Sequence, residues 1–325
     1  MSQGLLGLLI VLILCPSKAL TASVLGSDFL KKLAIYHAPV IYQEIGKNPR
    51  ADAITRFNFD GDWVGNNNWD NLEKYPTPAY VYYDVVETST HYFITYAFFH
   101  PRDYQAVCFW KFCHENDLEG AFYTVVKNPS HEMGDVVYIS TVAHYDIIGY
   151  ANPKTTVAPA PDLSGRDRRI ALRIDSGGHA VYNWDDLPNN NPRLIYSIGT
   201  TADDPNGKKN GTYRYLLTSM SDLWSRKDHV GRGKIWNKNF KYGGTRFQIG
   251  DVPEAFAGEK FGRGLAKPPW AWFDDTDSSY SKRGDWFFDP AYMVFMRLGQ
   301  PRGWSLEYIH NPYVGIVAPD SVSNF

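Results

Sequence analysis

Short runs of aromatic and β-branched residues, separated by clusters of Gly, Pro, Asn and Asp, dominate the pattern of this chain. Such runs fit the pleated surface of a β-strand, and the clusters between them are typical of turns. Because neighbouring runs are joined by turns, antiparallel pairing is favoured. The pattern predicts strands over residues 80–86, 91–99, 121–126, 136–142, 169–174 and 194–197.

Helical periodicity is confined to two segments of the chain. Ser27 and Asp28 suit the start of a short helix that ends before Pro39. A second helix is predicted over 215–227, where four apolar residues share one face: Leu216, Met220, Leu223 and Trp224. The expected fold is therefore all-β, a mainly antiparallel β-sandwich with a few short helices and long loops, one of them over 153–168.

The N-terminal region carries an apolar run over 5–15, followed by a proline and small residues. This pattern predicts a signal peptide over 1–22, cleaved near 19–22, because the run is shorter than the about 20 residues of a membrane span. Since a basic segment before the run is missing, an uncleaved signal anchor is the alternative. No later stretch is apolar enough to cross a bilayer. Residues 23–325 are expected to form a single β-sandwich domain, with an aromatic, loop-rich C-terminal extension from Gly243.

The net charge and the number of cysteines limit the class of binding partner and the cellular compartment that we expect for this chain. The net charge is -2 and no Lys/Arg-rich run is present, which argues against a nucleic-acid partner. Of three cysteines, Cys15 lies in the expected signal peptide, which leaves Cys108 and Cys113 to form a disulfide in an oxidising compartment. The sequon at Asn210 is a candidate glycosylation site and agrees with a secretory route.

The segment over 113–120 is the richest in candidate chemistry. Because side chains in a strand repeat every second residue, Asp117 and Glu119 are expected to face the same way, and a preceding turn would bring His114 onto that face. In a helix, Glu119 would instead lie well round the cylinder from His114. The aromatic and β-branched residues that follow favour the strand.

Two further residues lie at the ends of predicted strands, Asp103 upstream of the motif and His144 downstream of it. If the three strands are adjacent, both residues converge with His114, Asp117 and Glu119. An oxygen-rich set suits Mg²⁺, Mn²⁺ or Ca²⁺, which we prefer here, whereas two His and one carboxylate would suit Zn²⁺ or Fe²⁺. The alternative is that the two carboxylates lie on a solvated strand face and the imidazole only hydrogen-bonds a turn.

This motif, with the segments over 96–103 and 140–144, resembles the necrosis- and ethylene-inducing peptide-like proteins. Those proteins carry Gly-His-Arg-His-Asp-Trp-Glu after a similar strand end. Two residues depart from their pattern: Asn116 replaces a second His, and Leu118 replaces a Trp. Their toxin activity is therefore not transferred to this chain.

The vacuolar protein sorting-associated protein 62 family is more similar still, over about residues 36–313. Its members carry His-Glu-Gly-Asp-Trp-Glu, a later Gly-x-His-Ala-x-Tyr and a tryptophan-rich C-terminal part. The later signature reads here Gly177-Gly178-His179-Ala180-Val181-Tyr182. The resemblance implies a β-sandwich with a divalent cation bound near four residues: Asp103, His114, Asp117 and Glu119.

Three functions are compatible with these features. The leading hypothesis is a secreted or vacuolar protein of the sorting-associated type, whose cation binds a lipid head group or glycan. The first alternative is a metal-dependent hydrolase with Glu115 or His144 as the general base. The second is a secreted cytolysin, by analogy alone. Because Glu115 has no identifiable orienting partner and no oxyanion-stabilising group is evident, the sequence favours binding over catalysis.

Overall fold

The computed structural model describes residues 27–105, 107–108, 113–151, 157–159, 168–184, 192–259, 266–272 and 283–316. The expected signal peptide and most of the loop predicted over 153–168 lie outside these residues. Within the described part of the chain, no helix is both long and apolar enough to span a membrane.

Strands make up most of the regular structure. They are β1 (Val40–Glu44), β2 (Tyr80–Thr88), β3 (His91–Asp103), β4 (His114–Asn128), β5 (His131–Ala143), β6 (Asp146–Ala151), β7 (Val157–Pro159), β8 (Arg168–Ile174), β9 (Val181–Asn183), β10 (Arg193–Ile198), β11 (Gly211–Ser219), β12 (Trp236–Gly243), β13 (Gln248–Phe256) and β14 (Tyr308–His310). The α-helices are α1 (Ser27–His37), α2 (Asn68–Asn71), α3 (Ser221–Trp224), α4 (Asp285–Phe288) and α5 (Pro290–Arg297), with short 3₁₀ turns at Pro269–Ala271 and Pro312–Val314. The prediction of a mostly β protein with short helices is confirmed.

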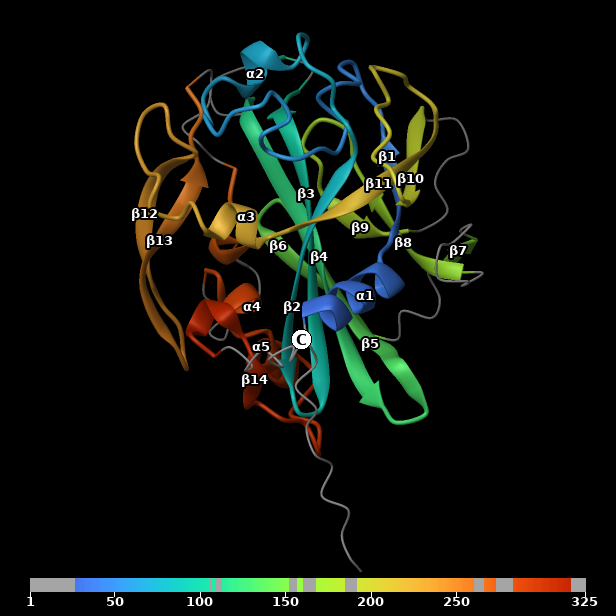
Figure 1. Ribbon diagram of the computed structural model, residues 1–325, viewed down its shortest axis with the longest axis vertical. Helices are drawn as coiled ribbons and strands as arrows, with labels where there is room; N and C mark the ends of the chain where they lie inside the picture. The colour runs from blue at the N-terminus through green and yellow to red at the C-terminus, as the bar shows by residue number, and fades with distance from the viewer. Residues whose placement is uncertain are drawn as a thin grey trace, which may run out of the picture.

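Twelve of these strands form one mixed sheet. Its order is β6-β5-β4-β3-β2-β11-β10-β1-β8-β7, with β14 paired to β2 and β9 to β8, while β12 and β13 form a separate two-stranded sheet. Pairing is mainly antiparallel, but β1–β8, β10–β11 and β11–β2 are parallel. Through these parallel pairs, the strands from β6 to β7 are paired without interruption. The sheet curls, and β9 contacts β4 and β5 (Figure 1).

The sandwich prediction is therefore only partly correct. Two layers do face each other, but both belong to one sheet that resembles an incompletely closed barrel rather than two separate packed sheets. The apolar runs in the sequence identify strands but not their partners, and two of the parallel pairs, β1–β8 and β11–β2, join segments that are far apart in the chain. Among the described strands, no pairing joins β6 to β7, so the sheet keeps an edge at each of these strands.

The helix predicted over 215–227 is likewise only partly correct. Residues up to Ser219 belong to β11, which lies between β10 and β2, and only α3 is helical. Met220 and Leu223 are buried, as the apolar pattern implies. Hydrogen bonding to two neighbouring strands overrides the local helical spacing.

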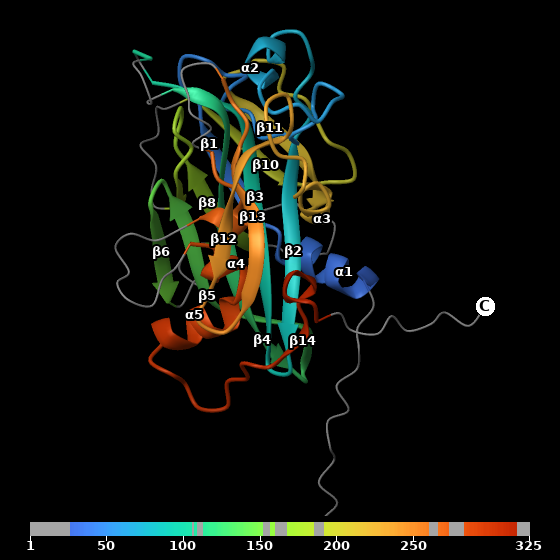
Figure 2. The ribbon, with the colours of Figure 1, turned by 90° about the vertical axis from the view of Figure 1, so that its left-hand side faces the viewer.

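Two hydrophobic cores lie on the two faces of the long strands. In β3, Tyr92, Ile94, Tyr96 and Phe98 belong to the inner core, beneath α1, whereas Phe93, Ala97 and Phe99 belong to the outer core. The outer core is covered by β12, β13, α4 and α5, which lie together in front of the sheet in Figure 2. The aromatic C-terminal part supplies Trp270 and Trp286 to it, and both are fully buried. Since both faces of β3 and β4 are covered, polar side chains on their inner face are shielded from water.

Candidate functional site

The candidate site lies where β3 ends and β4 begins. Antiparallel register places Asp103 opposite His114 and His100 opposite Asp117. The predicted strand over 121–126 thus starts earlier, at His114, and contains the whole motif. Asp117 and Glu119 are only 6% and 7% exposed. We call Asp103, Asp117 and Glu119 the acidic cluster.

His114 is oriented by the backbone of its own motif. Its Nδ1 lies 2.8 Å from the carbonyl oxygen of Asn116. Because a carbonyl oxygen only accepts, Nδ1 carries the hydrogen, so in the neutral ring Nε2 keeps a lone pair. Nε2 lies 3.5 Å from Oδ2 of Asp103. This lone pair and this carboxylate face each other, an arrangement that is stabilised by a shared proton or by a cation.

Asn116 points away from the acidic cluster. Its backbone has a φ of 60°, which breaks the regular alternation of β4. Its side chain is buried, donates to the carbonyl oxygens of Gly65 and Ala257 at 2.8 and 2.6 Å, and accepts from Asn68 at 2.8 Å. Asn116 therefore fixes the outer loops to β4 and takes no part in the site.

His179 connects the acidic cluster to a distant loop. Its Nδ1 lies 2.8 Å from Oδ2 of Asp117, and its Nε2 lies 3.2 Å from Oδ1 of Asp52. Burial by itself would lower the pKa of His179, but the hydrogen bonds and negative charges of the two carboxylates outweigh it and raise this pKa to about 9. His179 is therefore a buried cation that balances part of the charge of the cluster.

A second histidine is stacked on this cation. The rings of His100 and His179 are parallel within 3° and their centroids are 3.8 Å apart. Burial, followed by the charge of His179, lowers the pKa of His100 well below its ordinary value, so this ring is neutral. Its Nε2 contacts Oε1 of Gln43 at 3.0 Å.

Asp52 anchors the loops around this histidine pair. Its carboxylate accepts hydrogen bonds from the backbone N–H of Gly46 and of Gly177, each at 2.8 Å, and from the hydroxyl of Tyr104 at 2.7 Å. Sequence reasoning missed Asp52, His100 and Tyr104. Asp52 lies in a loop without any motif, and the nearest signal was the position of His100 just before Asp103.

Burial and neighbouring negative charge raise the pKa of two carboxyls of the acidic cluster, Asp103 and Glu119. Burial, then the charge of Asp117, raises the pKa of Asp103 to about 6, although His114 and His179 act in the opposite direction. Burial, then Asp117, and more weakly Asp103, raise the pKa of Glu119 well above its ordinary value. Among the described residues, Oδ1 of Asp103 and Oε2 of Glu119 are buried without a hydrogen-bond partner. Such oxygens are costly to bury and need a proton or a cation.

Two observations bear on whether these residues fit a metal ion. Within the described ranges, no group of three His, Cys, Asp or Glu side chains is arranged so that it could hold a metal ion. The donor chemistry does fit a hard cation, since carboxylate oxygens predominate and two of them lack partners. The residues thus supply suitable ligand atoms, but the described structure does not arrange three of them as a metal site.

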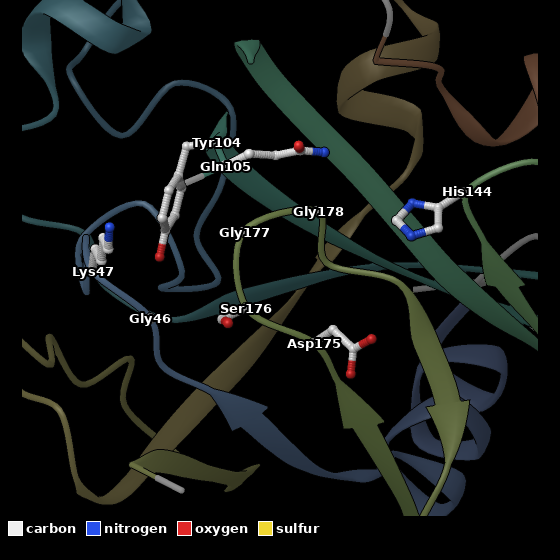
Figure 3. A pocket seen from close by; sticks show the side chains of 9 residues that line it. All are labelled: Gly46, Lys47, Tyr104, Gln105, His144, Asp175, Ser176, Gly177 and Gly178. Carbon is white, nitrogen blue, oxygen red and sulfur yellow. The ribbon is translucent and has the colours of Figure 1, made fainter. Parts of the chain in front are cut away.

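A pocket of about 410 Å³ (Figure 3) is lined in part by Gly178, which lies near Asp103 of the acidic cluster. Figure 3 shows the turn at Gly177 and Gly178 between Tyr104 on one side and His144 on the other. A Cβ at Gly178 would lie 3.0 Å from Cε1 of His144 and 3.8 Å from Oδ2 of Asp103. Glycine at this position therefore leaves room between the pocket and the cluster. The pocket is lined by Gly46, Lys47, Tyr104, Gln105, His144, Asp175, Ser176, Gly177 and Gly178.

The two candidate general bases have different surroundings. Glu115 is fully buried, and its carboxylate accepts hydrogen bonds from the backbone N–H of Trp69 at 3.2 Å and of Glu259 at 2.9 Å. The structure does not bring it to the pocket. His144 lies at the exposed turn between β5 and β6 with a φ of 62°, and its backbone N–H donates to Glu119. Of the two, only His144 borders the pocket.

The expected disulfide is confirmed, since Cys108 and Cys113 are bonded. The bridge closes the loop immediately before His114. Asn210, the candidate glycosylation site, is exposed at the start of β11, and its Oδ1 accepts from the backbone N–H of Arg193 at 3.2 Å. Its modification stays a prediction.

Comparison with known proteins gives neither a matching family model nor a matching curated protein. Among solved structures, the chain is similar to the non-toxic HaNLP3 protein, with 16% identity over 58% of this chain and 74% of that one and a TM-score of 0.35. NLPPya in complex with glucosamine gives 16% identity over 60% and 75%, with a TM-score of 0.34. Necrosis and Ethylene inducing Protein 2 from the causal agent of cocoa's Witches Broom disease gives 16% over 45% and 73%, with a TM-score of 0.23.

These similar structures carry the name of the family that the central motif resembles more remotely. The comparisons give no support to the vacuolar protein sorting-associated protein 62 family or to a vacuolar location. At such low identities and TM-scores, the likeness carries no conclusion about what this chain does.

Proposed function

We propose that this chain is a secreted binding protein that holds a divalent cation in the acidic cluster and uses it to bind a polar head group or glycan. One observation carries the proposal: Oδ1 of Asp103 and Oε2 of Glu119 are buried without partners beside a third carboxylate. Unpaired buried carboxylate oxygens are rare in native proteins because the loss of hydration is not repaid.

Charge balance supports the same proposal. The cluster has three carboxylates, and the buried cation that contacts it is His179, which Asp117 shares with Asp52. Burial and then the charge of Asp117 raise the pKa of both Asp103 and Glu119, because the positive charge near these two carboxyls does not offset these effects. A hard cation such as Ca²⁺, Mn²⁺ or Mg²⁺ suits oxygen ligands better than Zn²⁺ does. His114 would add its Nε2 lone pair, which faces Asp103.

The neighbouring pocket indicates the class of ligand. A bound cation would supply positive charge that attracts ligand oxygen atoms. The pocket adds an ammonium group at Lys47, a hydroxyl at Ser176 and a carboxylate at Asp175. Hydrogen-bond donors and acceptors are thus both present, which suits a polyhydroxylated or zwitterionic head group. We propose binding rather than hydrolysis because Glu115 is held by backbone N–H groups away from this pocket.

A second candidate function, a cytolysin-like action at a membrane surface, rests on two exposed apolar side chains. Val107 is 68% exposed and Tyr145 is 59% exposed. They follow Gln105 and His144, which line the pocket. Exposed apolar groups around a polar pocket suit a head group that is still attached to a membrane. Leakage of vesicles that contain the head group would favour this candidate, whereas binding without leakage would favour the first.

The proposal is tested by the metal content of purified protein and by calorimetric titration with Ca²⁺, Mn²⁺ and Mg²⁺. We expect the parent to bind one of these ions and the double variant Asp117→Ala with Glu119→Ala to lose it. Glu73→Ala with Glu132→Ala is the matched control, because it removes two carboxylates that are exposed and outside the cluster.

The isosteric variant Glu119→Gln keeps the test informative if the double variant fails to fold. We expect it to weaken cation binding by about tenfold or more, since it removes one charge from the coordinating set. Equal metal in the parent and in a folded cluster variant would refute the cation site.

A further inference from the structure

A second cavity, of about 810 Å³, lies at the other end of the long strands. We call it the distal pocket. β3 begins there with His91 and ends at the acidic cluster with Asp103, so the two sites are separated by the length of the strand. The volume is within the range of about 300–1,000 Å³ that small-molecule sites occupy. Neither the acidic cluster nor its pocket shares a residue with it.

The walls of the distal pocket are mainly apolar. Val137 of β5 and Leu298 after α5 are each 36% exposed, although both are large hydrophobic residues. Tyr92 and Trp304 supply aromatic surface between them. Apolar side chains from separate segments that surround one cavity are typical of a ligand site, because a bound molecule removes their surface from water.

Hydrogen bonds and a ring contact hold the Trp304 side of the pocket in place. The backbone N–H of Ser305 donates to Oγ1 of Thr90 at 2.9 Å, and Thr90 also contacts Nδ1 of His91 at 2.8 Å. The rings of His91 and Trp304 lie 3.8 Å apart, and the indole N–H of Trp304 donates to the carbonyl oxygen of Ala291 at 3.0 Å. These contacts fix the C-terminal loop to the turn between β2 and β3, so that the cavity is preformed.

Two cationic side chains line the distal pocket, Lys127 and Arg302, against one exposed carboxylate, Glu132. The ammonium of Lys127 lies 4.6 Å from the ring centroid of Tyr92 and also pairs with Glu87. Burial, then the charge of Lys127, lowers the pKa of His91 to about 4, and no carboxylate opposes this effect. His91 is therefore a neutral ring in this pocket. Within the described part of the chain, Arg302 adds a guanidinium without an ion-pair partner.

We propose that the distal pocket binds a free amphiphilic carboxylate of the fatty-acid class. Its carboxylate lies beside Lys127 and Arg302, and its apolar chain lies between Val137, Leu298 and Trp304. A purely apolar ligand would leave the cationic end without a counter-charge, and a small anion would leave the apolar walls exposed. This site is independent of the acidic cluster and of the function proposed for it.

The test is calorimetric titration of the full chain with decanoate, decanol and acetate. We expect decanoate to bind, decanol to bind at least about tenfold more weakly, and acetate to give no measurable binding. Leu298→Glu should weaken decanoate binding by about tenfold or more, because it adds a like charge to the apolar wall. Arg302→Gln should weaken decanoate but not decanol.

Two control variants establish that decanoate binds in the distal pocket and not elsewhere on the protein. Tyr75→Glu changes an exposed hydrophobic residue outside the pocket, 41% exposed, and should leave decanoate binding unchanged. The cluster variant Glu119→Gln should also bind decanoate as the parent does, whatever it does to cation binding. Absence of decanoate binding in the parent, equal binding of decanol, or unchanged binding in a folded Leu298→Glu variant would overturn the proposal.

Discussion

Replacing His179 with glutamine tests the network beneath the acidic cluster. His179 is fully buried, and each ring nitrogen contacts a carboxylate, Asp117 at 2.8 Å and Asp52 at 3.2 Å. After the change, Asp52 keeps three hydrogen-bond donors, but Asp117 loses the partner of its Oδ2. Removing one partner of a buried ion pair typically costs about 3–5 kcal/mol, because the remaining charge is uncompensated.

The pH dependence of stability gives an independent measure of the same residue. The pKa of His179 is raised to about 9 in the folded protein, against about 6.5 in an unfolded chain. The protonated ring therefore adds its full stabilisation to the free energy of unfolding below about pH 6.5, and this stabilisation is lost as the pH rises through 9. Linkage makes this loss on the order of 3 kcal/mol in the parent, and the glutamine variant should not show it.

Urea unfolding at pH 6 and at pH 9 measures both effects in one experiment. The exposed His229→Gln is the matched control, and its free energy of unfolding should stay within about 0.5 kcal/mol of the parent. A second expectation joins this network to the proposed function. Because the variant lacks the internal cation, saturating Ca²⁺ or Mn²⁺ should raise its stability more than that of the parent. Equal stability of the parent and of His179→Gln at pH 6 would refute the charged pair.

Three further predictions concern single features. Glu115→Gln should lower the free energy of unfolding by about 1–3 kcal/mol, because it weakens the hydrogen bonds to the backbone N–H groups of Trp69 and Glu259. Cation titrations should be unchanged. Loss of cation binding in a folded variant would contradict the placement of Glu115 outside the cation site. Replacing both Cys108 and Cys113 with serine should lower the free energy of unfolding, measured in urea, by about 2 kcal/mol, because the loop that the disulfide closes is short. A much larger loss would show that the disulfide stabilises more of the fold than this loop. Burial lowers the pKa of His91 to about 4 in the folded protein, so the stabilisation from its neutral ring is present above about pH 6.5 and is lost as the pH falls through 4. Between these two pH values, the free energy of unfolding of His91→Phe should therefore fall by about 1–2 kcal/mol less than that of the parent. Equal losses in the two proteins would count against a neutral buried ring.

The sequence by itself determined the strands and the common face of the motif carboxylates. All six predicted strand ranges lie within β2, β3, β4, β5, β8 and β10. Aromatic and β-branched residues favour the extended backbone wherever they occur in the chain, which makes this prediction local. The placement of Asp117 and Glu119 on one face follows equally from the two-residue period of a strand.

Other features depended on partners that no local pattern encodes. The segment before Met220 has apolar spacing that suits a helix, yet it is a strand because β10 and β2 offer hydrogen bonds on both sides. Glu115 belongs to the same motif as Asp117, but the positive φ of Asn116 and the buried hydrogen bonds of its side chain direct Glu115 elsewhere.

The charge state of the site was decided by tertiary structure alone. Asp52 lies 127 residues from His179 in the chain and has no motif around it, yet it helps to keep that ring protonated. The raised pKa of Asp103 and of Glu119 was also decided by the fold. It comes first from burial within the curled sheet, which excludes water, and then from the charge of Asp117. Backbone preference acts over a few residues, so the sequence reveals it directly. Desolvation and pairing of charges act between segments that only the complete fold brings together.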